Sequence, residues 1–232
     1  MTRKGTILRH LNRICWSGAT ALGLLAFAAC AQAQATYHVT TNTSSLSGQI
    51  GFLDFQFAKG NAFGSPDATA TLSNVVTDGL LATTSDATGT ASGILPGAAM
   101  VSNMGTSGFP NELNQGITFG QVFNFDITFT GTALNPAVSS NYGSTFAYSL
   151  FGSDDATPLL TTDPNGTLLD INLSKGANLS ATTFPTTPGG RSVVTATTGA
   201  PVPEGSSAVS LGLLLILSAG GLTAVRLRRK IS

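Results

Sequence analysis

The chain has 232 residues, of which 42% are hydrophobic and 9% charged, and its formal net charge at pH 7 is zero. Eight of its eleven Lys and Arg residues lie in the first 13 and the last seven positions, so residues 36–200 carry three basic and ten acidic side chains, a formal charge of −7. Because a surface of that charge repels phosphate backbones, we expect no nucleic-acid partner.

The first 35 residues have the layout of a secretory signal peptide. Four basic residues among the first 13 precede an apolar stretch from about Ala19 to Ala29, and small residues follow. A positive start, a short apolar segment and an A-x-A site are the features that the export machinery recognises. We therefore predict an N-terminal signal helix, export through the Sec translocon and cleavage by signal peptidase after Ala33 or Ala35.

Both cysteines of the chain, Cys15 and Cys30, lie in this segment. A second interpretation makes Cys30 the lipidated residue of a lipoprotein, although Phe27 stands where such a site normally has a leucine-like residue. Cleavage after Ala33 or Ala35 leaves a mature domain without cysteine, which excludes disulfide bonds and thiol chemistry. At roughly 165 residues, that domain is long enough for one hydrophobic core.

Alternating side chains predict β-strands across the middle of the chain. Over residues 117–130, six apolar residues occupy one parity and polar residues occupy most of the other. The same alternation recurs in residues 53–57, 146–150 and 169–173. Because alternation with a period of two marks a strand with one buried and one solvated face, we predict an all-β ectodomain, an antiparallel β-sandwich or jelly-roll-like fold.

Turn chemistry and composition refine this prediction. Asn165-Gly166, flanked by Leu159-Leu160 and Leu168-Leu169, predicts a β-hairpin, because Asn and Gly tolerate the positive φ that a tight hairpin turn needs. The hydroxyl-rich stretches 69–90 and 182–198 show no comparable alternation, and we place them outside the strands.

One pattern occurs twice in the chain. Residues 52–60 and 168–176 align without gaps as apolar, Leu, Asp, apolar, amide, apolar, small, Lys, Gly. One interpretation is that strands ending in a turn converge on such a pattern. The other is that the two strands occupy neighbouring or pseudo-symmetric places and present carboxyl and amide groups on one face suited to sugar hydroxyls. The side chains of this predicted polar face are Asp54, Gln56, Asp170 and Asn172.

Signatures of enzymes are scarce. A Ser-His-Asp triad needs a held imidazole, and no G-x-S-x-G motif surrounds any serine, so we interpret His38 as an exposed or edge-strand residue. Zinc requires several His or Cys ligands. We therefore predict no enzymatic activity, no cofactor and no metal site. A carboxylate pair for glycoside hydrolysis, drawn from Asp54, Asp126, Asp170 and Glu112, is the alternative.

Oxygen ligands gather around the predicted hairpin, and calcium prefers such ligands. Their spacing lacks the D-x-[DN]-x-[DN]-G pattern of a calcium loop, so we favour turn formation by Asp and Asn, with calcium binding as the alternative. The residues concerned are Asp154, Asp155, Asp163, Asn165 and Asp170.

The final thirty or so residues combine three parts. A short polar segment, 201–207, precedes an apolar stretch, 208–225, that no charge interrupts. At about 1.5 Å per residue this stretch spans roughly 27 Å, close to the roughly 30 Å hydrocarbon core of a bilayer, and predicts a C-terminal transmembrane helix. The basic cluster that we expect to stay cytoplasmic consists of Arg226, Arg228, Arg229 and Lys230.

This order of polar signal, membrane-length helix and basic end resembles the PEP-CTERM sorting tail. The resemblance implies that a bacterial exosortase recognises and processes the tail of an inner-membrane intermediate, and that the protein then passes to the cell envelope or the extracellular space. The matching motif is Pro203, Glu204 and Gly205, in which Gly205 departs from the second proline of the family pattern. A permanently anchored single-pass membrane protein is the alternative.

The segment 51–57, with Gly60, also resembles a functionally uncharacterised family of PEP-CTERM proteins, and the similarity extends to residues 123–151 and 163–173. This resemblance implies a shared fold and brings no catalytic residues. The association of PEP-CTERM proteins with exopolysaccharide implies a non-enzymatic envelope or extracellular-matrix protein of biofilms. A secreted carbohydrate-binding or glycan-hydrolysing module is the alternative.

The expected partners are the Sec translocon, signal peptidase, an exosortase, the membrane and exopolysaccharide. The sequence thus predicts five parts in chain order. The parts are a signal peptide (1–35), a β-sandwich ectodomain (36–194), a linker with the Pro-Glu sorting motif (195–207), a transmembrane helix (208–225) and a basic cytoplasmic tail (226–232).

Overall fold

A computed structural model describes residues 34–61, 64–104, 111–135, 137, 142–174 and 178–199. Within these ranges the chain forms twelve strands and two short 3₁₀ helices, η1 (Ser44–Leu46) and η2 (Thr132–Leu134). The strands are β1 (Ala35–Asn42), β2 (Ile50–Lys59), β3 (Thr69–Thr77), β4 (Leu80–Thr88), β5 (Ser92–Gly93), β6 (Ala99–Ser102), β7 (Asn111–Thr118), β8 (Val122–Thr130), β9 (Ser144–Gly152), β10 (Thr167–Ser174), β11 (Asn178–Thr183) and β12 (Val194–Thr198).

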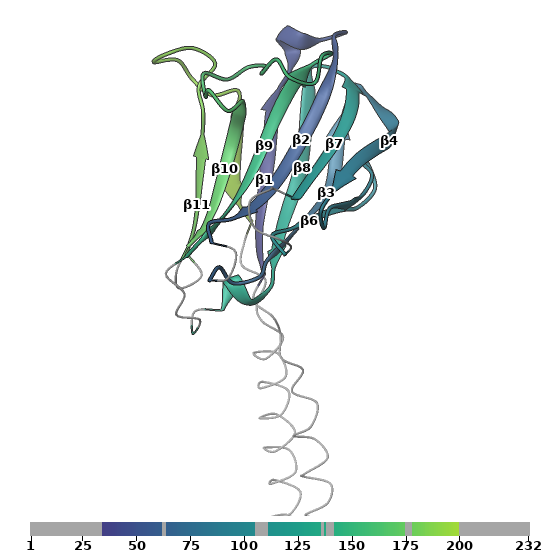
Figure 1. Cartoon of the computed structure of the whole chain (residues 1–232). Helices are drawn as coiled ribbons and strands as arrows, with labels where there is room; N and C mark the ends of the chain where they lie inside the picture. The colour runs from purple at the N-terminus through teal and green to yellow at the C-terminus, as the bar shows by residue number, and fades with distance from the viewer. Residues whose placement is uncertain are drawn as a thin grey trace, which may run out of the picture. The chain divides into compact units, whose positions relative to one another are not determined.

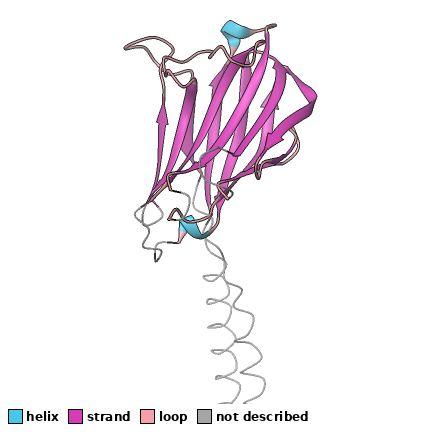
Figure 2. Ribbon diagram, viewed as in Figure 1, coloured by secondary structure: helices cyan, strands magenta, loops and turns pink. Residues whose placement is uncertain are grey.

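The strands form two antiparallel sheets that face each other as the layers of a sandwich (Figures 1 and 2). We call them sheet A, in the order β12-β1-β8-β3-β6-β5, and sheet B, in the order β11-β10-β9-β2-β7-β4. The prediction of an all-β domain with antiparallel sheets is confirmed. The predicted signal and transmembrane helices lie outside the described residues, and no helix among the described residues is both long and apolar enough to span a bilayer.

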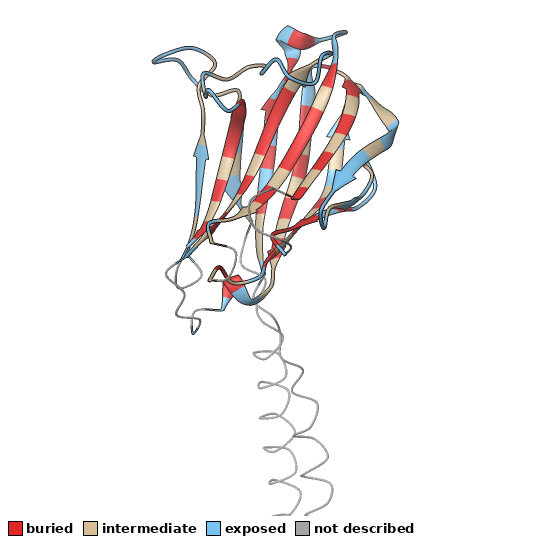
Figure 3. Ribbon diagram, viewed as in Figure 1, coloured by how far each residue is buried: buried red, intermediate tan, exposed pale blue. Residues whose placement is uncertain are grey.

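Aromatic side chains from both sheets fill the space between the layers. The ring of Phe55 on β2 stacks on Tyr148 of β9 at 5.3 Å and meets Phe125 of β8 edge-on at 5.4 Å. Burial raises the pKa of the Tyr148 phenol far above its usual range. Buried and partly exposed residues alternate along β2, β7, β9 and β10 (Figure 3), as the sequence pattern predicts for strands with one face in the core.

The stretch 117–130 is not the single strand that its alternation predicts. β7 ends at Thr118 in sheet B, and β8 begins at Val122 in sheet A. The chain therefore changes sheet in the middle of the pattern. The inner faces of the two sheets point toward each other, so Phe119 and Phe123 on either side of the crossing are both buried. The alternation of apolar and polar residues therefore continues across the crossing, although the backbone does not form one strand.

The crossing between sheets is closed by Asp78. Its Oδ1 accepts hydrogen bonds from the backbone N–H groups of Gln121, at 2.8 Å, and Val122, at 3.0 Å. The bond from Val122, followed by that from Gln121, lowers the pKa of the Asp78 carboxyl. A side chain at position 120 would collide with the same carboxylate, so the turn requires Gly120.

Only one of the two strands predicted for the hairpin around Asn165-Gly166 forms. The turn itself is present, since the backbone N–H of Gly166 donates to the Asp163 carbonyl at 3.0 Å and Gly166 has a φ of +85°. No strand runs through Leu159-Leu160, however, because Leu160 adopts a φ of +59°. That left-handed conformation interrupts extended backbone, so only the second arm becomes a strand, β10.

Strands also form where the sequence showed only abundant hydroxyl groups. The stretch 69–90 contains β3 and β4, and the stretch 182–198 contains the end of β11 and all of β12. Threonine is β-branched and favours strands, but small or polar residues at the inward positions weaken the alternation. Since β12 pairs with β1, the sheet continues to Thr198, beyond the boundary predicted at residue 194.

The two ends of the described domain lie together. The backbone N–H of Gly199 donates to the Thr36 carbonyl at 2.8 Å, next to the pair Tyr37 and Thr198. We call this the terminal end of the sandwich. At the opposite end, which we call the distal end, η1 and the loop through Gln121 connect the strands (Figure 1).

Candidate functional site

The four side chains of the predicted polar face lie on one surface. Strands β2 and β10 flank β9, so the two copies of the repeated pattern are separated by one strand of sheet B. Ala147 on β9 lies opposite both Gln56 and Asp170. Because residues directly opposite in neighbouring strands share a face, the outer surface of sheet B carries both carboxyl–amide pairs. We call the surface formed by Asp54, Gln56, Asp170 and Asn172 the polar face.

Hydrogen bonds orient the amides of the polar face. The Nε2 group of Gln56 donates to Asp54 Oδ2 at 2.9 Å, and the Thr145 hydroxyl donates to Asn172 Oδ1 at 2.8 Å. Partial burial, and then the charge of Asp163, raises the pKa of the Asp170 carboxyl. The polar face therefore presents donors and acceptors in positions set by neighbouring strands.

Strand β7 extends this surface with two polar residues, Glu112, already considered as a candidate acid, and Asn114, which the sequence pattern did not identify. Asn114 lies opposite Asp54, and Glu112 lies opposite Gln56. The Nδ2 group of Asn114 donates to Asp155 Oδ1 at 2.8 Å, which fastens the loop after β9 to the outer surface of β7. Nothing in the spacing of residues 114 and 155 indicates this contact, because it depends on a loop folding back over the sheet.

Asp54 is the anomalous member of the polar face. The sequence predicts it on the solvated side of its strand, yet only 2% of it is exposed, and its Oδ1 accepts no hydrogen bond. Burial, together with the charge and hydrogen bond of Glu112 and the charge of Asp155, raises its pKa to about 8, against a lowering by the Gln56 hydrogen bond. The raised pKa favours the neutral form of Asp54, whose O–H can donate a hydrogen bond to the Glu112 carboxylate.

The structure separates the acids considered for glycoside hydrolysis. Asp54 and Glu112 lie together on sheet B, whereas Asp126 is on β8 in sheet A. Asp170 is on β10, two strands away from Asp54. The burial of Asp54 leaves the one close carboxyl pair with little access for a sugar or for water.

His38 is held more firmly than the sequence suggests. Its Nδ1 lies 2.5 Å from Asp126 Oδ1, and the other carboxylate oxygen accepts a bond from Asn74 Nδ2 at 2.7 Å. The side chain is 56% exposed, as expected, but β1 lies inside sheet A between β12 and β8 and is not an edge. Among the described residues, no serine or threonine hydroxyl hydrogen-bonds to this imidazole.

Two acids of the predicted calcium alternative serve turns. The Asp154 carboxylate accepts bonds from the hydroxyl and backbone N–H of Thr157 and from the N–H of Ala156, and these bonds lower its pKa. Asp163 Oδ2 accepts a bond from the backbone N–H of Thr167 at 3.0 Å. In the part of the chain that the structure describes, no group of three or more His, Cys, Asp and Glu residues could hold a metal ion.

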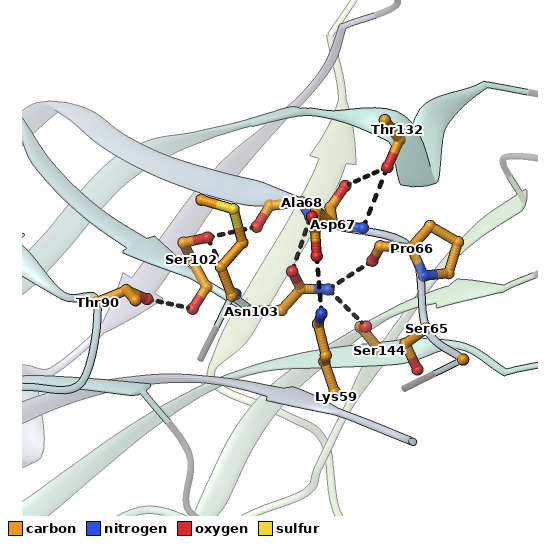
Figure 4. A network of polar contacts seen from close by, with 12 residues as sticks. Lys59, Ser65, Pro66, Asp67, Ala68, Thr90, Ser102, Asn103, Thr132 and Ser144 are labelled. Atoms are coloured by element: carbon orange, nitrogen blue, oxygen red, sulfur yellow. Dashed lines mark hydrogen bonds and ion pairs between the residues drawn. The ribbon is translucent and has the colours of Figure 1, made fainter. Parts of the chain in front are cut away.

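A polar network at the terminal end joins the two sheets (Figure 4). The Asn103 side chain accepts from the Ala68 N–H at 2.8 Å and donates to the Pro66 carbonyl and the Ser144 hydroxyl. Beside it, Lys59 forms an ion pair with Asp67 at 2.7 Å. The lysine of the first repeated segment thus stabilises the sandwich, while the lysine of the second lies outside the described residues.

Several predicted sites also fall outside the described residues. They are the sorting motif Pro203, Glu204 and Gly205 and the basic cluster Arg226, Arg228, Arg229 and Lys230.

No protein-family model, no curated protein and no solved structure matches the chain. Fold and site define the class as a two-sheet antiparallel β-sandwich with a carboxyl–amide face.

Proposed function

We propose that the chain is an exported protein of the cell envelope or extracellular matrix, sorted and processed by an exosortase through its tail, and that its domain acts without catalysis in contact with exopolysaccharide. The sorting part of this proposal rests on the three-part tail and on the signal segment. The part that concerns the domain rests on the geometry of the sandwich.

The observation that carries the proposal is the meeting of both ends of the domain on neighbouring strands. The described chain begins and ends at the terminal end, where the Gly199 N–H donates to the Thr36 carbonyl. A domain tethered there keeps the outer surfaces of both sheets and the distal end available to the surroundings. That arrangement suits a protein that works by surface contact.

The polar face supports contact with polysaccharide. Gln56 and Asn172 lie on either side of β9 and carry amides that both donate and accept hydrogen bonds. A hydrated glycan offers hydroxyl groups of the same dual character. The formal charge of −7 over residues 36–200 favours neutral over anionic polymers.

The sorting part is tested at the mature carboxyl terminus. In cells with an exosortase, we expect the intact mass of the exported protein to lack the segment after the Pro-Glu motif, because the enzyme processes the tail. In cells without the enzyme, we expect the tail to be retained. Substitution Glu204→Ala should give the same retention, and Glu112→Ala is the control in the folded domain. Equal retention of the tail with and without the enzyme would contradict sorting by exosortase.

The contact with polysaccharide is tested with purified exopolysaccharide from the producing strain. We expect the double variant Gln56→Ala, Asn172→Ala to be retained at least tenfold less than the parent protein, since each substitution removes a partly exposed amide. Thr197→Ala, an exposed polar truncation on the outer surface of sheet A, should leave retention unchanged. Equal retention of the double variant contradicts a role of the polar face, and release of reducing ends would instead support hydrolysis.

A further inference from the structure

A hollow of about 430 Å³ opens at the distal end of sheet A. It lies where β1 ends, β8 begins and β12 begins, on the sheet that does not carry the polar face. Its volume is within the range of small-ligand sites, roughly 300–1,000 Å³. Its polar lining residues are Thr40, Thr41, Asn42, Ser44, Gln121 and Thr195.

The lining is polar but carries no charge. Hydroxyl and amide groups can both donate and accept hydrogen bonds, and Val122 and Val193 add methyl groups beside them. A charged ligand would lose hydration here without meeting an opposite charge, which is costly. A molecule with many hydroxyl groups and apolar C–H edges matches the lining.

The walls of the hollow are fixed by hydrogen bonds. Asn42 Oδ1 accepts from the backbone N–H of Ser44 at 3.1 Å and from its hydroxyl at 2.7 Å. The backbone N–H of Asn42 donates to the Val193 carbonyl at 3.0 Å, and that of Thr43 donates to the Gln121 carbonyl at 2.9 Å. Because these groups are already ordered before binding, less of the binding free energy is lost in ordering them.

Two threonines form the side of the hollow nearest the sheet edge. Thr40 on β1 lies directly opposite Thr195 on β12, and both are exposed. Their hydroxyls therefore lie side by side on the outer surface of sheet A. The next pair toward the terminal end is His38 and Thr197, and neither residue lines the hollow.

We propose that this hollow binds a neutral saccharide unit of an uncharged glycan, with the hydroxyls of Thr40 and Thr195 among its hydrogen-bonding partners. This inference goes beyond the proposed function, because it adds a separate site on the other sheet and names the chemistry of its ligand. The position at the distal end, away from the tethered end, leaves the site accessible to a polymer outside the cell.

The test is calorimetric titration of the full chain in mild detergent. The probes are three neutral trisaccharides, maltotriose, cellotriose and laminaritriose, and one acidic trisaccharide, trigalacturonate. We expect at least one neutral probe to bind and the acidic probe not to bind. The double variant Thr40→Val, Thr195→Val keeps the β-branched shape and removes both hydroxyls, and we expect it to bind at least tenfold more weakly.

Matched variants separate the outcomes. Thr197→Val makes the same change on the same strand outside the hollow and should bind as the parent does. Thr195→Lys fills the hollow from an exposed edge position and should also abolish binding. The proposal is overturned if no neutral probe binds, if the acidic probe binds as tightly, or if both hollow variants bind normally. Loss of exopolysaccharide retention in Gln56→Ala, Asn172→Ala with trisaccharide binding intact shows that the two sites act separately.

Discussion

Replacement of Asp54 by asparagine is expected to stabilise the domain at pH 8 and to change its stability little at pH 4. The side chain is 2% exposed, and its pKa is raised to about 8 by burial first and then by Glu112. Asparagine has the shape of the neutral acid and can still donate to Glu112 and accept from Gln56. It never carries the charge that this site disfavours.

The direction of the pH dependence follows from proton uptake. Between pH 4 and pH 8 the folded protein holds a proton on Asp54 that the unfolded chain, with the ordinary value of 3.8, has released. The contribution of this group to stability is fully present below about pH 4 and falls by up to about 1.4 kcal/mol per pH unit as the pH rises. At pH 8 the free energy of unfolding of the Asp54→Asn variant should be a few kcal/mol higher than that of the parent protein, because each unit of pKa shift corresponds to about 1.4 kcal/mol.

Urea unfolding of the full chain, followed by far-ultraviolet circular dichroism at pH 4, 6 and 8, measures this difference. Asp86→Asn is the matched control, because Asp86 lies in the same cross-strand row, beyond Asn114, and is exposed on β4. We expect its effect to stay within about 0.5 kcal/mol at every pH. A change in Asp54→Asn that is the same at all three values would show that Asp54 is ionised in the folded protein.

Truncation of Phe55 to alanine is expected to lower the free energy of unfolding by about 3–5 kcal/mol, the usual cost of removing a buried aromatic side chain. Phe55 is fully buried and contacts aromatic rings from both sheets, at 5.3 Å to Tyr148 and 5.4 Å to Phe125. A domain without disulfide bonds depends on such packing, so the cavity would affect both layers.

Phe52→Ala on the same strand is the control for this substitution. Phe52 has the opposite parity and is only half-buried on the outer surface of sheet B. We expect its truncation to cost less than about 2 kcal/mol in the same urea titration. Equal losses at the two positions would mean that the space between the sheets is not the main source of stability.

Strand β2 shows how far the sequence pattern could lead. The alternation of Phe55 and Phe57 with Asp54 and Gln56 predicted the strand and the side of each residue, because the period of two depends only on local backbone geometry. One of the two interpretations of the repeated pattern put β2 and β10 in neighbouring or pseudo-symmetric places, and in sheet B only β9 separates them. The pattern could not predict the raised pKa of Asp54, since Glu112 and Asp155, which add to the effect of burial, come from another strand and a loop.

Other features escaped the pattern for related reasons. The pairing of His38 with Asp126 joins residues 88 positions apart and appears only once the register of β1 and β8 is known. The hollow on sheet A is lined by hydroxyl and amide groups that the sequence places among unremarkable polar residues. Local periodicity identifies which face is buried, but a site assembled from several strands depends on sheet order and register.

The pairing of β1 has a consequence for the order in which the domain folds. This strand, which follows the predicted signal segment, pairs only with β8 and β12 in sheet A, so Tyr37 meets Ile127 and Thr198. During synthesis this strand therefore has no partner in sheet A until β8 has followed it, and contacts between such distant segments form slowly. The last strand joins immediately before the tail. Sheet A is thus completed only when the chain has been made through residue 198, directly before the segment in which we propose the sorting signal.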